Sequence, residues 1–303
     1  MTTRREFMKA GIGAGALLAL GARRAVGLPQ SAESPLKTLR GNMGTFEQQG
    51  GTILWLDAGD ALAVVDTQFP DSAGVFWSAI AGKGERKIDL LMNSHHHGDH
   101  TGGMPVLKPH ALRSVAQKNV PDLQRRQMKQ RGIEGEPVTA DELFETEWTA
   151  DLGKESVHAR HYGPGHTAGD AVIHFQHADI AHMGDLVFNR MPAFIDRSAG
   201  ASISGWIDRL ETLHKSFSDS TMFVYGHGNP AYGISGGRAD MLVMRDFLSG
   251  LLDYTRKGIA EGRSKDDLAR IEKLPGFPEH FRADWVTAIP LNIAAAYEEL
   301  TEE

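Results

Sequence analysis

Four side chains of types that commonly bind metals fall within six residues of this chain. His95, His97, Asp99 and His100 form the pattern H-x-H-x-D-H directly after the apolar run Ile88–Met92. Imidazole and carboxylate groups are ligands of zinc and related divalent ions, and the neighbouring glycines allow the backbone a tight turn. The spacing therefore indicates a compact metal-binding loop at the end of a strand.

Three more candidate ligands follow along the chain, each at the end of an apolar run and next to glycine. They are His166 in Gly-Pro-Gly-His-Thr-Ala-Gly-Asp, Asp185 in Met-Gly-Asp and His227 in Gly-His-Gly. The other histidines lack this shared context, and most are expected at the surface or hydrogen-bonded in the core. They are His96, His110, His158, His161, His174, His177, His182, His214 and His280.

The elements that must position these residues are predicted from the spacing of apolar residues. Short apolar runs separated by turn residues predict strands at 52–56, 61–67, 88–93, 157–162, 171–175, 180–183 and 221–225. Helical spacing predicts helices at 71–81, 116–131, 203–217, 239–261, 265–271 and 285–299. Strands in two batches, each followed by helix, favour two sheets packed face to face with helices outside, an α+β fold.

Composition excludes several classes of protein and site. The 303 residues carry a formal charge of −7, which becomes about −11 once the +4 of residues 1–27 is removed, so nucleic acid is not an expected partner. The chain has no cysteine. Disulfides, thiolate metal ligands and a cysteine nucleophile are therefore excluded.

The N-terminus predicts export. Thr3–Lys9 resembles a twin-arginine signal, the apolar stretch Ala10–Ala22 is shorter than the roughly 20 residues that span a bilayer, and Ala25–Gly27 offers small residues for cleavage. We expect a signal peptide at 1–27, a linker at 28–37 and a catalytic domain at 38–303. The expected location is periplasmic or secreted, with the twin-arginine machinery as a partner and no stable membrane span after cleavage. An uncleaved anchor is the alternative.

Four motifs carry a family resemblance. HHHGDH, GPGHTAGD, GD and GHG, in this order between Gly41 and Gly228, resemble the motifs of the metallo-β-lactamase superfamily. The resemblance implies an αββα four-layer sandwich with metals at the strand ends along one edge. It also implies one metal on His95, His97 and His166, a second metal on Asp99, His100 and His227, and Asp185 bridging both.

The implied function is a dinuclear hydrolase. A metal-bridging hydroxide, oriented by Asp99, would attack a small ester, thioester, lactone or amide. These ligands suit two Zn²⁺ per chain and also accept iron or manganese. A bridging aspartate is typical of glyoxalase II-like thioesterases, lactonases and phosphodiesterases, whereas β-lactamase subclasses with cysteine at the position of Asp185 are excluded.

Other functions stay open as alternatives. One is a mononuclear-iron, persulfide dioxygenase-like oxidoreductase, and another is a true β-lactamase. A non-catalytic metal-binding protein is a third, against which the seven intact ligand positions argue. Diiron-flavin reductases are disfavoured because they typically have glutamate where His97 stands and carry a flavodoxin domain.

Substrate contacts are expected from the segment Leu186–Phe194, which follows Asp185 and contains Arg190; the alternative is that it only packs at the sheet edge. A solvated helix or a lid is expected at 117–131. The C-terminal helices, about 239–303, either cover the substrate or serve packing and dimerisation. The G-x-S-x-G pattern at 233–237 is interpreted as a loop, because no strand runs directly into its serine.

Overall fold

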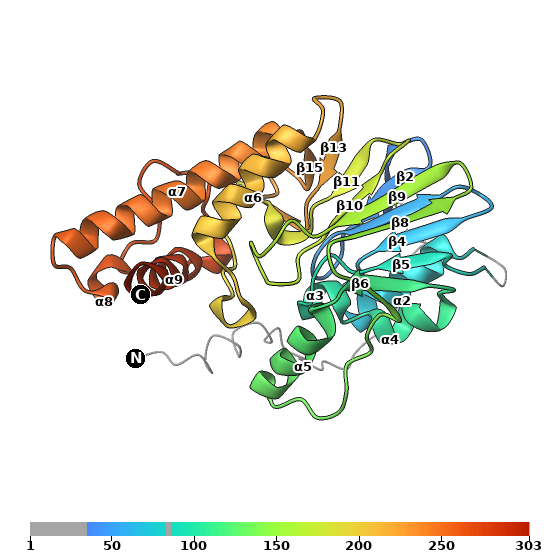
Figure 1. Ribbon diagram of the computed structural model, residues 1–303, viewed down its shortest axis with the longest axis horizontal. Helices are drawn as coiled ribbons and strands as arrows, with labels where there is room; N and C mark the ends of the chain where they lie inside the picture. The colour runs from blue at the N-terminus through green and yellow to red at the C-terminus, as the bar shows by residue number, and fades with distance from the viewer. Residues whose placement is uncertain (1–34, 83–85, 303) are drawn as a thin grey trace, which may run out of the picture. The chain divides into compact units, whose positions relative to one another are not determined.

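A computed structural model describes residues 35–82 and 86–302 of the chain (Figure 1). The expected signal peptide and residues 28–34 of the expected linker lie outside the described residues. The first strand begins at Leu36, so the last two residues of that linker belong to a sheet. The described residues form one compact unit by their internal contacts, and this unit holds all of the described helices and strands.

A seven-stranded sheet forms the first half of the fold. Its strands follow chain order: β1 (Leu36–Arg40), β2 (Met43–Phe46), β3 (Ile53–Asp57), β4 (Leu62–Val65), β5 (Leu90–Met92), β6 (Ser114–Gln117) and β7 (Glu142–Phe144). Neighbours from β1 to β4 pair antiparallel, and those from β4 to β7 pair parallel. Strands β4 and β5 are apolar throughout because both of their faces are covered.

A six-stranded sheet forms the second half, and a small two-stranded ladder lies beside it. The larger sheet has the order β15 (Ser235–Gly236), β13 (Met222–Val224), β11 (Ile180–His182), β10 (Val172–Phe175), β9 (Glu155–Arg160) and β8 (Glu147–Leu152). The ladder joins β12 (Phe188–Asn189) to β14 (His227–Gly228) in parallel. Strands β11 and β13 also pair in parallel, so their C-terminal ends meet at one edge.

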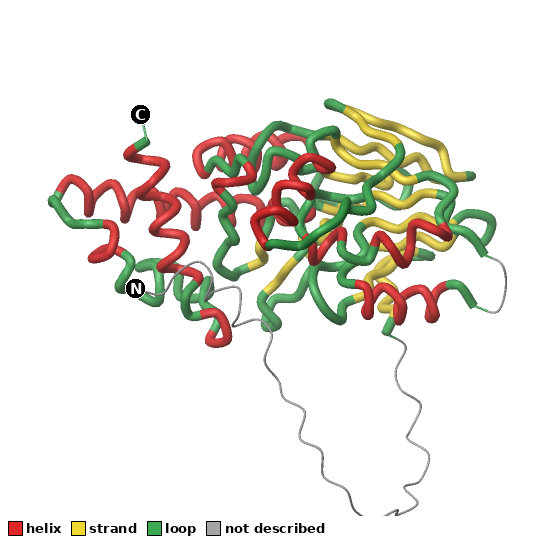
Figure 2. Tube along the Cα trace, turned by 90° about the horizontal axis from the view of Figure 1, so that it is seen from below, coloured by secondary structure: helices red, strands yellow, loops and turns green. Residues whose placement is uncertain are grey.

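Helices lie outside the two sheets, on their outer faces or at their edges (Figures 1 and 2). They are α2 (Pro70–Ile80), α3 (Gly98–Thr101), α4 (Met104–Leu107), α5 (Val120–Arg131), α6 (Ile203–Ser216), α7 (Ala239–Ala260), α8 (Lys265–Leu268) and α9 (Ala288–Thr301). Short 3₁₀ turns lie at 108–110, 184–186, 197–199 and 283–285. Among the described residues, no helix is both long and apolar enough to cross a membrane.

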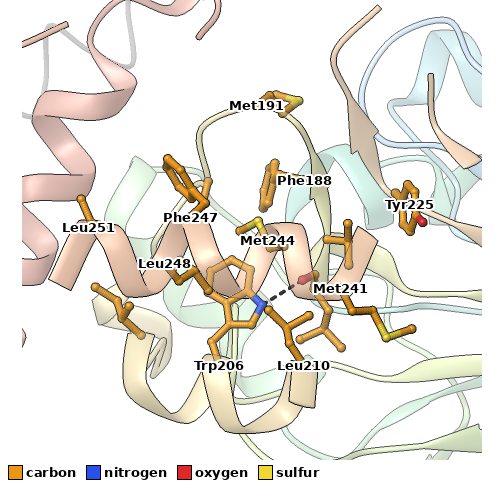
Figure 3. Packing of buried hydrophobic residues seen from close by; sticks show 14 of the residues in the cluster. Phe188, Met191, Trp206, Leu210, Tyr225, Met241, Met244, Phe247, Leu248 and Leu251 are labelled. Atoms are coloured by element: carbon orange, nitrogen blue, oxygen red, sulfur yellow. Dashed lines mark hydrogen bonds between the residues drawn. The ribbon is translucent and has the colours of Figure 1, made fainter. Parts of the chain in front are cut away.

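Three large apolar cores join these layers. Alternation along β4 sends Ala63 and Val65 toward the second sheet, while Leu62 and Val64 pack against α2. A third core lies between the second sheet and helices α6, α7 and α9, with Trp206 near its centre (Figure 3). The order is therefore helix, sheet, sheet, helix, and the expected αββα four-layer sandwich is confirmed.

The expected elements agree with the structure except in identifiable places. All seven expected strands are present, but eight others were not expected: β1, β2, β6, β7, β8 and the two-residue strands β12, β14 and β15, the last of which lies in the segment 233–237 that was interpreted as a loop. The helix expected at 116–131 begins only at Val120, since Ala116 and Gln117 belong to β6. The last helix begins at Ala288 rather than Trp285. Short edge strands such as β1, which is largely exposed, carry little apolar periodicity and so give a weak signal.

Candidate metal centre

Strand order brings the seven candidate ligands to one edge of the sandwich. The loop after β5 and the first turn of α3 carry four of them, and the loop between β9 and β10 carries His166. Asp185 follows β11, and His227 follows the adjacent parallel strand β13. Because neighbouring parallel strands end at the same edge, side chains from distant parts of the sequence converge there.

The first ligand set consists of three imidazoles and one carboxylate. His97 Nδ1 lies 3.0 Å from His95 Nε2 and 2.9 Å from His166 Nε2. Asp185 Oδ2 lies 3.8 Å from His95 Nε2 and 3.5 Å from His166 Nε2. All four side chains are buried, and these atoms all lie within 4.8 Å of one another.

The second set shares the same aspartate. His227 Nε2 lies 3.0 Å from Asp99 Oδ2 and 3.3 Å from His100 Nε2, and His100 Nε2 lies 3.6 Å from Asp99 Oδ2. Asp185 reaches this set as well, with Oδ1 3.2 Å from His100 Nε2 and Oδ2 3.5 Å from His227 Nε2. The structure thus brings together all seven residues that the sequence singled out.

The spacing of these donor atoms fits divalent cations. Tetrahedral ligands about 2.1 Å from a zinc ion lie roughly 3.4 Å from one another, and the spacings above scatter around this value. Asp185 Oδ1 is also buried and, within the described part of the chain, makes no hydrogen bond of good geometry. A buried carboxylate oxygen without a donor is costly, and a cation beside it would satisfy it.

Asp66 organises a histidine from each set. Its Oδ2 accepts from His100 Nδ1 at 2.8 Å and from Ser94 Oγ at 2.7 Å, and its Oδ1 accepts from the Ser94 amide at 2.7 Å. Ser94 Oγ lies 3.0 Å from His95 Nδ1 and can accept the proton there. This chain of contacts leaves the Nε2 atoms of both histidines facing the cluster, which is the arrangement a metal ligand needs.

Asp196 plays the same part for His97. Its Oδ2 lies 3.3 Å from His97 Nε2, so the proton is held on that nitrogen and Nδ1 is left to face the first set. His96, the middle histidine of the motif, is buried and forms a third potential ligand group with these two residues. Burial, reinforced by the nearby His97, lowers the pKa of His96 to about 2, so its imidazole is neutral.

Asp170 shapes the loop that carries His166. Its two carboxylate oxygens contact the Thr167 amide at 2.9 Å and the Thr167 hydroxyl at 2.6 Å. Burial raises the pKa of Asp170 to about 7, against the opposing effect of these hydrogen bonds. The protonated acid can donate to the Thr167 hydroxyl, which itself accepts from the Gly169 amide.

The electrostatics of the cluster suit cation binding. Burial and the neighbouring imidazoles lower the pKa of His95 well below its usual value and that of His166 to about 3. Burial alone would lower the pKa of His100 and raise that of Asp185, but their opposite charges reverse both shifts. His95 and His166 are therefore neutral and Asp185 is ionised, whereas His100 holds a proton in the metal-free cluster, and a divalent cation would replace that proton.

Two close approaches explain the glycines beside the ligands. A side chain at Gly226 would collide with Asp185 and with the His100 ring, so His100 and Asp185 could not meet if this residue were larger. Gly184 has a positive φ of 52°, and a Cβ there would lie 2.8 Å from Ser94. The glycine context that marked the ligands in the sequence therefore reflects crowding around the cluster.

A pocket of about 430 Å³ opens onto both ligand sets. Phe188, Met191 and Phe194 line it, which confirms the expected contribution of the segment after Asp185. Arg190 points elsewhere, because it pairs with Asp240 at 2.7 Å and stacks on Tyr232. The remaining wall comes from the last residue of α5 and from the segment before α9, and the lining residues there are Arg131, Arg282, Asp284 and Trp285.

Sequence reasoning missed the residues that support the ligands. Asp66 and Asp196 were not singled out, although Asp66 is a carboxylate directly after the buried strand β4 and so carried a usable signal. Asp196 lies in an irregular segment, and its sequence neighbours gave no signal of its role. Ser235 of the G-x-S-x-G pattern lies in β15, paired with Val224, and α7 begins only at Ala239.

Comparison with known proteins agrees with this geometry. A sequence profile described as the Metallo-beta-lactamase superfamily matches residues 48–227. A lactamase-like protein, ptaB, of Pestalotiopsis fici is 26% identical over 209 residues, covering 67% of this chain and 57% of that protein. A metallo-beta-lactamase type 2 of Bacillus cereus is 23% identical over 176 residues, covering 58% of this chain and 66% of that protein. An atrochrysone carboxyl ACP thioesterase of Aspergillus chevalieri is 33% identical over 90 residues, 29% of each chain.

The chain spans less than two thirds of the length of each of these relatives.

Solved structures share the fold at low sequence identity. A metallo-beta-lactamase from Pontibacter korlensis superposes with a TM-score of 0.58 at 16% identity, covering 71% of this chain and 98% of that one. The sec-alkylsulfatase Pisa1 from Pseudomonas sp. superposes with a TM-score of 0.68 at 11% identity, covering 88% of this chain and 50% of that one. Because the profile matches more than half of this chain, the chain belongs to the metallo-β-lactamase superfamily.

Proposed function

We propose that this enzyme is a dinuclear metal-dependent hydrolase of small esters, thioesters, lactones or amides. The observation that carries the proposal is the position of Asp185 between two ligand sets. One of its oxygens faces His95, His166 and His227, and the other faces His100. A carboxylate so placed can serve two cations at once, as two-metal hydrolase sites require.

We propose two Zn²⁺ as the cofactors, held by His95, His97 and His166 on one side and by Asp99, His100 and His227 on the other, with Asp185 shared. Iron or manganese accepts the same imidazole and carboxylate donors. When bound, two such cations supply a hydroxide nucleophile at neutral pH and polarise the substrate carbonyl.

Asp99 is the ligand residue best placed to act on the attacking water. Its side chain is 28% exposed, whereas the side chain of Asp185 is 4% exposed, and both line the pocket. A carboxylate with this access can orient the water and accept its proton. Phe188, Met191 and Phe194 line the same pocket, so a substrate that packs against them would displace water from the reacting group and strengthen electrostatic interactions there.

The relatives support carbonyl chemistry. One similar protein is described as a thioesterase, which favours a thioester or ester over a phosphodiester. Hydrolysis of β-lactams is the second candidate, because similar proteins from Bacillus cereus and Bacteroides fragilis are described as metallo-beta-lactamases. A secondary alkyl sulfate belongs in any substrate panel, since one structural neighbour is described as a sec-alkylsulfatase.

The test combines elemental analysis with a substrate panel of a thioester, a lactone, a carboxylic ester, nitrocefin, a phosphodiester and a secondary alkyl sulfate. We expect about two zinc ions per chain and turnover of a carbonyl substrate that a chelator abolishes and added zinc restores. One iron per chain with oxygen uptake on a persulfide would overturn the proposal in favour of the oxidoreductase alternative. Full metal content without turnover of any substrate would favour a binding protein.

A pair of variants tests the shared aspartate. Asp185→Ala should lose metal from both sets and lower kcat/KM by at least about 10³-fold, because removing the common ligand leaves each cation undercoordinated. His177→Ala is the matched control, since this histidine is 68% exposed and lies outside the cluster. Loss of only one metal in Asp185→Ala would contradict a bridging position.

We also propose that residues 1–27 direct twin-arginine export and are then removed. The support is the sequence pattern Thr3–Lys9 with the apolar stretch that follows it. N-terminal sequencing of protein recovered from the periplasm or medium should begin near Leu28. Intact protein retained in the membrane fraction would support the uncleaved anchor.

A further inference from the structure

Two arginines line the pocket beside the ligand cluster, and they differ in their surroundings. Arg282 donates to Asp284 through Nε, at 2.8 Å, and through Nη2, so a carboxylate within the same wall compensates its charge. Arg131 makes no ion pair or side-chain hydrogen bond with any residue in the described ranges 35–82 and 86–302. Of the two arginines that line the pocket in the described part of the chain, Arg131 alone therefore offers an uncompensated positive charge.

The position of Arg131 is defined by the helix that bears it. It is the last residue of α5, whose first turns are anchored by the buried Val120 and Leu123. A Cβ placed on Gly98 would lie 3.6 Å from Arg131 Nη1, so the guanidinium stands over the loop between the ligands His97 and Asp99.

The other pocket residues are suited to an apolar group. Phe188, Met191, Phe194 and Trp285 contribute aromatic and thioether surface. A ligand that fills such a pocket gains binding free energy by burying apolar area, and a single unpaired arginine can orient it. An oxyanion suits this arginine because the planar guanidinium binds carboxylate-type groups through two parallel hydrogen bonds.

The geometry points to Arg131 as the residue that recognises an oxyanionic group on the substrate, whose remaining body is apolar. This inference rests on the proposed function for the identity of the reacting carbonyl. The substrate is then an anionic ester or thioester in which a carboxylate, or a similar oxyanion, lies beside the reacting group. Arg131 acts on substrate binding and leaves the metals in place.

Matched substrates test this role. A succinyl thioester and the butanoyl thioester of the same thiol share the reacting group and differ in a terminal carboxylate. We expect Arg131→Gln to lower kcat/KM for the succinyl substrate about tenfold, mainly through KM, as for a partly hydrated charge-assisted hydrogen bond. The butanoyl substrate should change less than about twofold, and Arg131→Lys should fall between wild type and Arg131→Gln.

Arg126→Gln is the matched control, because this arginine is an exposed residue of the same helix and does not line the pocket. Metal content should equal that of the wild type in all three variants. Equal losses on both substrates, or none on the succinyl substrate, would overturn the assignment of Arg131.

Direct binding separates this inference from the proposed function. Titration calorimetry of the metal-loaded protein with 4-phenylbutyrate and with 4-phenylbutanol compares one apolar body with and without a carboxylate. Arg131→Gln should weaken the acid about tenfold and leave the alcohol unchanged, even if no thioester is hydrolysed. If the acid bound wild type and variant equally, the metals alone would hold the carboxylate and the role of Arg131 would be wrong. Failure of the acid to bind the wild type would also contradict it.

Discussion

At the scale of single residues, the cluster depends on side chains that never face the substrate. Asp66 is fully buried, and its backbone adopts a positive φ of 66° that lets its carboxylate contact Ser94 and His100 at once. Through these two residues it fixes the protonation of one histidine in each ligand set. A single carboxylate therefore supports both proposed metal positions.

Asp66→Asn tests this support. Asparagine tolerates the left-handed backbone, but its amide group brings a second donor against His100 Nδ1 and the Ser94 hydroxyl. We expect zinc affinity to fall about 10- to 100-fold, measured by competition with a chromophoric chelator. Asp60→Asn, at an exposed position, should leave the affinity unchanged. Unaltered affinity in Asp66→Asn would show that the hydrogen bonds of Asp66 are dispensable.

The raised pKa of Asp170 predicts that the free energy of unfolding depends on pH. Its pKa is about 7 in the folded protein and 3.8 in an unperturbed carboxyl, so the unfolded chain releases the proton first as pH rises. The free energy of unfolding then falls between about pH 4 and pH 7 and is constant above that range. Asp170→Asn resembles the protonated acid, so the metal-free variant should gain on the order of 2 kcal/mol over wild type between pH 5 and pH 8.

Thermal and urea unfolding of metal-free protein at the two pH values measures the Asp170 effect. Comparing the variant with wild type at each pH removes the contribution of all other titrating groups. A stability difference that is the same at pH 5 and pH 8 would show that Asp170 ionises normally in the fold.

At the scale of elements, a contact between the last helix and α6 braces the segment that supports His97. Glu299 of α9 accepts from the backbone amides of Ile203 and Ser204, at 2.7 and 2.9 Å, and from Arg197 at 2.9 Å. These amides begin α6, where an anionic group offsets unpaired donors and the helix dipole. Asp196, which holds His97, directly precedes Arg197 and shares this brace.

Glu299→Ala should lower the free energy of unfolding by about 2 kcal/mol, because it leaves two helix amides without their acceptor and removes one of the acceptors of Arg197. Urea unfolding measures the change. Glu298→Ala is the control, since its pair with Lys265 is 42–44% exposed and should contribute less than about 1 kcal/mol. Similar losses for the two variants would contradict a specific role for Glu299.

At the scale of the whole unit, the C-terminal helices belong to the same folded body as the sandwich. Trp206 of α6 packs with Phe247 of α7 and donates to the Leu186 carbonyl, just beyond Asp185 (Figure 3). The same apolar core contains Phe223 of the second sheet and Ile293 of α9. The segment before α9 also lines the pocket, so the C-terminal region contributes both to packing and to the pocket wall.

Phe247→Ala tests whether this body unfolds as one. Phe247 is fully buried, with its ring stacked 4.5 Å from that of His280, and its truncation should cost about 3–5 kcal/mol. Urea unfolding followed by tryptophan fluorescence and by far-UV circular dichroism should give one shared transition. Leu291→Ala, at a residue 42% exposed, should cost less than about 1 kcal/mol. Two separate transitions would show that the helices form an independent module.

The ligands could be found without a structure because chemistry restricts both their type and their neighbours. H-x-H-x-D-H needs imidazoles and a carboxylate within one loop, and His166, Asp185 and His227 each carry a glycine that the crowded cluster requires. Buried strands such as β4 and β5 could be predicted because continuous apolar runs leave few other structures.

The supporting residues and the pocket could not be predicted in this way, because they depend on contacts between distant segments. Asp66 meets His100 across 34 positions and Asp196 meets His97 across 99, and no local pattern encodes either pair. Arg131 and Trp285 line one pocket only because α5 and the segment before α9 fold toward the same edge. Ligand identity is a property of local chemistry, whereas the orientation of each ligand and the choice of substrate depend on how the layers pack.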